Sequence, residues 1–184
     1  MKDLNFIIRL RFFLISLICF FPFALVLGPF FTDLTLSIIG LIFLFFLFKE
    51  RLWFYIKNLY VIIFLVWCLY LIINSLFSEN ILLSLESSLF YFRFIFFSLG
   101  IWYAIESNFK TIKYFAISLS LVFVILIFDS FFQYFFLYNF LVNEYNGSRL
   151  SGLFGEEQIL GSFISRLIPL LFGFLIFSFS KNKF

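Results

Sequence analysis

Long apolar runs separated by short polar breaks dominate the sequence. Reading the runs between the breaks predicts helical spans at about residues 12–27, 34–48, 60–77, 89–105, 115–137 and 159–179. A bilayer core of about 30 Å needs roughly 20 apolar residues per helix, and most of these runs approach that length. The pattern predicts an all-α fold: a polytopic membrane bundle of about six transmembrane helices, forming a single transmembrane domain over residues 1–184.

The first two predicted spans are short and lie close together in the sequence. The segment 28–33 separates them and begins with Gly28 and Pro29. Both residue types favour turns, so we expect a tight helical hairpin over residues 12–48. The alternative is one long, broken helix.

Composition supports the membrane class and excludes several kinds of site. Hydrophobic residues make up 64% of the chain and charged residues 12%, against about 25% charged residues in a typical soluble domain. The chain has no His, which excludes His metal ligands and a Ser-His-Asp triad. Cys19 and Cys68 lie inside apolar runs and are expected to be packing residues, so neither a metal site nor a cofactor is predicted.

Charge adds two expectations, one on partners and one on orientation. A net charge of +3 with scattered basic residues argues against nucleic acid as a partner. Lys and Arg concentrate in alternate breaks: Lys2, Arg9 and Arg11; Lys49, Arg51 and Lys57; Lys110 and Lys113; Lys181 and Lys183. The other breaks are mainly acidic and contain Asp33; Glu79 and Glu86; and Glu144, Glu156 and Glu157 beside Arg149. This alternation predicts that both termini are cytoplasmic.

Three ionisable residues fall inside predicted spans, where charges are costly and are functional candidates by default. At about 1.5 Å per residue, Arg93, Arg166 and Asp129 lie about 8, 10 and 12 Å below the outer boundary. We expect them to share a cavity open to the outer side. Two alternatives stay open: Arg93 and Asp129 form a structural ion pair, and Arg166 extends to the outer headgroups.

Further polar residues accompany these charges on the last two spans. Gln133 follows Asp129 by four residues and shares its helix face. Gly161 and Ser165 form a small-xxx-small pair, which permits close helix approach. Arginines near the outer surface suit an anionic phosphate or pyrophosphate, which the guanidinium binds through two hydrogen bonds. Arg149, in the expected outer loop, is placed to close over the same site.

Two stretches of the sequence, 129–139 and 149–161, carry a family resemblance. They contain Asp129 and Gln133 before an outer loop, then Arg149, Gly152 and Phe154 in an Arg-x-x-Gly-x-Phe pattern, and Gly161 at the start of the next span. Together with Arg93 in the preceding span, this arrangement resembles the superfamily of O-antigen ligases and O-antigen polymerases.

The resemblance implies a function in lipopolysaccharide and other cell-surface polysaccharide biosynthesis. Such proteins are bacterial inner-membrane glycosyltransferases that use undecaprenyl-pyrophosphate-linked glycans at the periplasmic face, without metal or nucleotide. The acceptor is the lipid A core for ligases and a growing glycan for polymerases. It implies pyrophosphate contacts by Arg149, Arg93 and Arg166, supported by Asp129, Gln133, Gly152 and Gly161, and leaves the catalytic residues unknown.

The chain also departs from this family. Members are about twice as long, and the ligases carry a functionally important His in a later periplasmic loop, which has no counterpart here. The expectation is therefore the N-terminal part of a longer enzyme. Two alternatives stay open: a transporter or flippase of lipid-linked glycans, and an inactive, truncated remnant.

The charge alternation generates a direct test of topology. Reporter fusions after residues 82 and 147 should indicate the periplasm, and fusions after residues 57 and 183 the cytoplasm, because Lys and Arg are retained inside. A periplasmic signal at residue 57 would contradict the hairpin.

Overall fold

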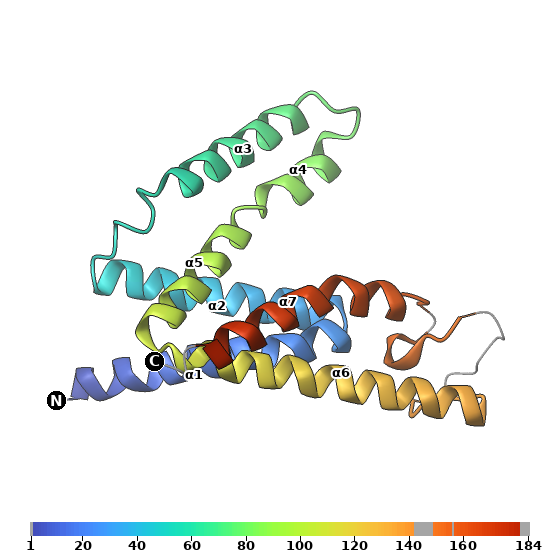
Figure 1. Ribbon diagram of the computed structural model, residues 1–184. Coiled ribbons are helices and arrows are strands. Elements are labelled where there is room, and N and C mark those ends of the chain that lie inside the picture. The colour runs from blue at the N-terminus through green and yellow to red at the C-terminus, as the bar shows by residue number, and fades with distance from the viewer. Residues whose placement is uncertain (1, 142–148, 156, 181–184) are drawn as a thin grey trace. The chain divides into compact units, whose positions relative to one another are not determined.

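The computed structural model describes residues 2–141, 149–155 and 157–180 (Figure 1). Within these ranges the chain is all-α and contains no β-strand. The helices are α1 (Lys2–Leu27), α2 (Pro29–Lys49), α3 (Leu59–Ser75), α4 (Ile81–Leu89), α5 (Arg93–Ser107), α6 (Lys110–Phe136), the 3₁₀-helix η1 (Gly152–Phe154) and α7 (Leu160–Ser180). Glu144, Glu156, Lys181 and Lys183, used above in the charge pattern, lie outside the described residues.

Several of these helices have the length and composition of membrane spans. In the part of the chain that the structure describes, four segments are long and apolar enough to cross a bilayer: Asn5–Leu27, Pro29–Lys49, Ile81–Ser107 and Lys110–Phe136. Leu59–Ser75 and Leu160–Ile176 are shorter apolar helices. The predicted all-α bundle of apolar helices is confirmed: the described residues contain four segments of full spanning length, one of which comprises α4 and α5, and two shorter helices.

The contacts divide the chain into two compact units, which are described separately. The first unit comprises Met1–Leu14 and Leu34–Ser107, and the second comprises Ile15–Asp33 and Asn108–Phe184. The first half of α1 and most of α2 therefore belong with α3, α4 and α5. The second half of α1 belongs with α6 and α7.

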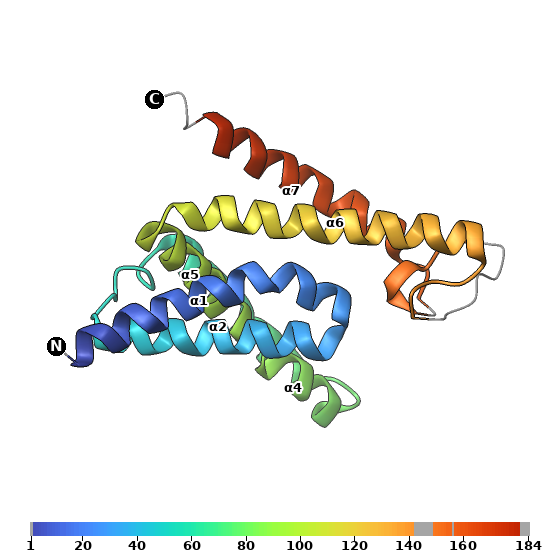
Figure 2. The same ribbon diagram turned by 90° about the horizontal axis from the view of Figure 1, so that it is seen from below.

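The predicted hairpin is confirmed, but its turn is shorter than expected. The chain reverses between α1 and α2 (Figure 2) at Gly28 alone, whose φ of +121° suits glycine. Helix α2 already begins at Pro29, because proline is favoured at the first helical position. The Thr32 hydroxyl lies 3.0 Å from the carbonyl oxygens of Ala24 and Gly28, which ties the first turn of α2 to the end of α1.

The predicted span 89–105 is interrupted in the structure and begins earlier in the sequence, at Ile81. Residues 90–92 form a turn between α4 and α5, and α4 occupies part of the expected outer break. The amides of Tyr91, Arg93 and Phe94 donate to carbonyls three residues earlier, replacing the α-helical pattern. Consecutive aromatic residues favour helix less than straight-chain residues do, which is consistent with an interruption there. Helix α4 packs against α3, where the Ser75 and Ser88 hydroxyls are hydrogen-bonded at 2.9 Å.

A polar network closes one end of the first unit. Arg11 of α1 forms a 2.6 Å ion pair with Glu50, which also accepts a 3.0 Å hydrogen bond from the Tyr103 hydroxyl of α5. Beside it, Tyr55 donates to the carboxylate of Glu106. Burial and the Glu106 carboxylate raise the pKa of Tyr55, so its phenol remains a proton donor at neutral pH. The network links Arg11 of α1 to the segment that follows α2 and to the last turns of α5.

Helices α2 and α5 approach closely at Gly100. A Cβ there would lie 3.0 Å from Ile39 Cγ2 and 3.4 Å from Phe43 Cβ, and both neighbours are fully buried. By contrast, a Cβ at Gly173 of α7 would meet no atom within 4 Å.

These glycines give a matched test of packing in the first unit. Gly100→Leu should lower the melting temperature in detergent, because overpacking costs about 1–3 kcal/mol and Ile39 cannot move aside. Gly173→Leu should leave it unchanged or raise it, because leucine favours helix by up to about 1 kcal/mol over glycine. Equal melting temperatures for the two variants would contradict the α2–α5 contact.

Candidate functional site

One face of α6 changes from apolar to polar along its length. Its buried residues follow helical spacing, and the last of them are Leu126, Asp129, Ser130 and Gln133. Leu126 packs with Val122 and Leu160 in the core of the second unit. Asp129 and Gln133 are both fully buried. A buried polar pair in an apolar helix requires hydrogen-bond partners, and the following loop supplies them.

Gln133 binds the chain segment that leads into η1. Its side-chain oxygen accepts hydrogen bonds from the amides of Ser151 at 3.1 Å and Gly152 at 2.9 Å. Its side-chain nitrogen donates to the Ser151 hydroxyl at 3.1 Å. One amide side chain therefore makes three hydrogen bonds to two consecutive residues. It fixes the position of residues 151 and 152 on α6.

Asp129 and Asn139 hold the segment that leaves α6. The helix ends at Leu137, which adopts a left-handed conformation with φ of 65°. Just beyond it, the Phe140 amide donates to Asp129 Oδ1 at 3.0 Å, and the Asn139 side chain donates to the Gly152 carbonyl. The two ends of the loop are therefore tied to α6 and to each other. Asn139 and Ser151 were not singled out from the sequence, although Asn139 closes the stretch 129–139.

Gly152 is required by this arrangement for two reasons. Its φ of +57° is unfavourable for residues with a side chain. A Cβ there would also lie 3.3 Å from Leu160 and 3.4 Å from Asp129 Oδ2. That oxygen is buried and has no hydrogen-bond partner in the described part of the chain.

Arg149 lines a cavity formed by the loop, Tyr134 of α6 and the start of α7. The cavity has a volume of 630 Å³, and its lining includes Tyr134, Arg149, Leu150, Gln158, Gly161 and Ser162. Arg149 is exposed. A Cβ at Gly161 would meet no atom within 4 Å. Thus the close helix approach expected at Gly161 is not found within the described residues, and this glycine opens the cavity instead.

A second, apolar cavity adjoins the first. It has a volume of 360 Å³ and shares Tyr134, Leu150 and Leu160 with the Arg149 cavity. The rest of its lining comes from α6 and α7: Ile127, Ser130, Phe131 and Ile164. The second unit therefore has an apolar cavity next to one that is lined in part by a basic and by polar residues.

The other predicted site residues are placed differently. Arg166 is exposed on α7 and lines neither of these two cavities. Asp129 is buried against the loop and does not line either of these cavities. Arg93 belongs to the first unit, so its predicted pairing with Asp129 stays a prediction. Among the described residues, no group of three or more Cys, Asp or Glu side chains is arranged to hold a metal ion.

The role of Gln133 can be tested through the loop amides. Gln133→Leu removes the acceptor of two buried amides, and each unsatisfied group costs about 1–3 kcal/mol. Hydrogen exchange at Ser151 and Gly152 should become roughly ten- to a hundredfold faster, since about 1.4 kcal/mol corresponds to a factor of ten. Phe135→Leu, at an exposed position near the end of α6, serves as the control and should leave exchange unchanged. Unaltered exchange in Gln133→Leu would refute the anchoring role.

No protein-family model, curated protein or solved structure matches this chain. Its function is therefore inferred from these residues and their geometry.

Proposed function

We propose that the protein is a membrane glycosyltransferase of the O-antigen ligase or polymerase kind, acting on undecaprenyl-pyrophosphate-linked glycans. It would function at the periplasmic face of the bacterial inner membrane, in cell-surface polysaccharide biosynthesis. The observation that carries the proposal is the Arg149 cavity adjoining an apolar cavity in one helical unit.

The polar cavity suits the pyrophosphate group. Arg149 supplies a permanent positive charge and a planar donor group that matches phosphate oxygens. Gln158 and Ser162 also line the cavity and offer further polar groups. The N-terminus of α7 at Leu160 lies in the same lining, and helix N-termini favour anions through their free amides and dipole. These features all favour a negatively charged group.

The apolar cavity suits the lipid part of the same molecule. Ile127, Phe131 and Ile164 lie on helices whose outer surfaces are apolar, so the cavity is placed to receive a chain from the bilayer. A polyprenyl pyrophosphate needs both a cation and an apolar groove. A soluble sugar phosphate needs only the cation. The adjoining apolar cavity therefore favours the lipid-linked substrate.

The chemistry follows from the leaving group. When the glycan is transferred to an acceptor hydroxyl, the bond between the sugar and the pyrophosphate breaks, and negative charge develops on the departing oxygen. A preorganised arginine stabilises this charge without metal or nucleotide. In this proposal the acceptor is the lipid A core or a growing glycan. Arg93 and Arg166 stay predicted contacts, and no general base is assigned.

Binding of undecaprenyl pyrophosphate to the protein in nanodiscs tests the proposal. Hydrogen bonds to charged groups contribute about 1.5–3 kcal/mol, so Arg149→Ala should weaken binding roughly ten- to a hundredfold. Arg149→Lys keeps the charge but loses the two-donor geometry, and it should bind with intermediate affinity. Glycan transfer in membranes should decline in the same order.

Two comparisons control for general effects. Arg51→Ala removes an exposed arginine of the first unit and should bind as the unchanged protein does. Undecaprenol, which lacks the pyrophosphate, should bind weakly and should not distinguish Arg149→Ala from the unchanged protein. Wild-type affinity of Arg149→Ala for undecaprenyl pyrophosphate would defeat the assignment.

A further inference from the structure

The loop between α2 and α3, residues 50–58, is folded and not extended. At the end of α2, Arg51 adopts a left-handed conformation with φ of 54°, and the Leu52 amide donates to the Leu47 carbonyl at 3.1 Å. The Tyr55 amide then donates to the Leu52 carbonyl at 3.2 Å. These hydrogen bonds give the loop a defined shape.

Tyr55 anchors this loop to the helices of the first unit. It is 2% exposed, and its ring makes edge-on contacts with Phe43 of α2 and Trp102 of α5, at centroid distances of 5.7 and 5.3 Å. Its neighbours Trp53 and Phe54 are 44% and 59% exposed. The buried anchor therefore leaves two aromatic side chains at the surface of the unit.

The acidic and basic side chains around the loop differ in their contacts. Glu50 and Glu106 each accept hydrogen bonds from two neighbouring side chains. Lys49, Arg51 and Lys57 are exposed and form no ion pair within the described residues. The carboxylates are thus used within the protein, and the three cations are available for contacts outside it.

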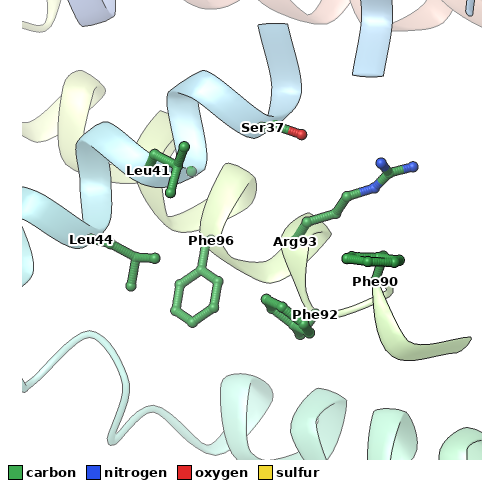
Figure 3. Close-up of a pocket in the computed structure, with 8 residues that line it drawn as sticks. Ser37, Leu41, Leu44, Phe90, Phe92, Arg93 and Phe96 are labelled. Atoms are coloured by element: carbon green, nitrogen blue, oxygen red, sulfur yellow. The ribbon is translucent and has the colours of Figure 1, made fainter. Parts of the chain in front are cut away.

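The face of α2 that leads to the loop is apolar. Leu41 and Leu44 line a cavity together with Phe96 of α5 (Figure 3). Phe48, in the last turn of α2, is 65% exposed, and its ring centroid lies 5.4 Å from that of Trp53. Helix α2 has the length and composition of a membrane span. In a bilayer, acyl chains would cover this face up to its last turn, and the loop would lie at the level of the headgroups.

The exposed residues of the loop match the chemistry of that level. Tryptophan is enriched at membrane–water interfaces, where one part of its ring system contacts apolar chains and its N–H contacts polar groups. Lys and Arg next to a span are attracted by the negative surface potential of a leaflet that contains anionic lipids. A zwitterionic leaflet offers much less of this attraction, so an anionic phospholipid is the favoured partner.

We propose that Lys49, Arg51, Trp53, Phe54 and Lys57, here called the basic loop surface, bind the headgroups of anionic phospholipids. The three cations contact phosphate oxygens, and the two aromatic side chains lie at the boundary between headgroups and acyl chains. Because the cations share these contacts, none of them forms a site for one individual lipid. The inference is independent of the function proposed above, because none of these residues lines the Arg149 cavity.

Photocrosslinking from the loop to lipids tests this assignment. Phe54→p-benzoylphenylalanine places a photoreactive group on the basic loop surface, in vesicles of equal amounts of phosphatidylglycerol and phosphatidylcholine, and mass spectrometry identifies the crosslinked lipids. Phosphatidylglycerol adducts should exceed phosphatidylcholine adducts roughly five- to tenfold, because each basic residue near the surface contributes a factor of about five. Lys49→Gln combined with Lys57→Gln should lower this ratio several-fold, whereas Lys49→Arg combined with Lys57→Arg should preserve it.

Phe77→p-benzoylphenylalanine provides the matched control. Phe77 is also exposed, but it follows the opposite end of α3, and no Lys or Arg lies near it in the sequence. Its adducts should show no preference for phosphatidylglycerol and no dependence on Lys49 and Lys57.

Each contrary outcome bears on the proposal. Equal adducts of the two lipids at residue 54, or an unchanged ratio in the folded variant with both lysines replaced by Gln, would overturn it. Adducts that are mainly with a protein in whole membranes would do the same. If the double variant does not fold, salt decides: at about 1 M, where the Debye length is about 3 Å, the preference for phosphatidylglycerol should disappear. A preference that persists at this salt concentration would contradict the charge contacts.

Discussion

The backbone of a non-helical segment in an apolar environment must find hydrogen-bond partners, and the second unit depends on how this requirement is met. No bulk water is available at membrane depth, so each unsatisfied amide or carbonyl is costly. Asp129 and Gln133 supply acceptors to the amides of Phe140, Ser151 and Gly152. These two residues of α6 therefore make it possible for the chain to leave the helix and return close to its end.

The cavity that contains Arg149 is a consequence of this anchoring. Because Gln133 fixes residues 151 and 152, Arg149 and Leu150 are held above the start of α7. The charge of Arg149 is then close to Gln158 and Ser162, and it adjoins the apolar surface of α6 and α7. Asp129 and Gln133 line neither of these two cavities, and their hydrogen bonds go to the loop. The shared cavity of Arg93, Asp129 and Arg166 that depth suggested stays a prediction, because Arg93 belongs to the first unit.

The sequence was informative where a single physical effect dominates. Apolar run length predicted the long helices, and Gly28 with Pro29 predicted the reversal between α1 and α2. The sequence was less informative where tertiary contacts determine where a helix ends or which residues form hydrogen bonds. The interruption at 90–92 follows no proline or glycine, and nothing in the sequence marks Ser151 as a partner of Gln133. Depth estimates placed Asp129 and Arg166 at a similar level in the membrane. They did not show that Asp129 is buried and Arg166 is exposed.

We propose that the two adjoining cavities of the second unit hold a polyprenyl pyrophosphate. The most direct measurement is photocrosslinking with a polyprenyl pyrophosphate that carries a photoreactive group on its isoprenoid chain, followed by peptide mapping. We expect labels on α6 and α7 residues of the apolar cavity, such as Phe131 and Ile164, and loss of these labels in Arg149→Ala. Labels confined to other helices, or labelling that is independent of Arg149, would contradict it.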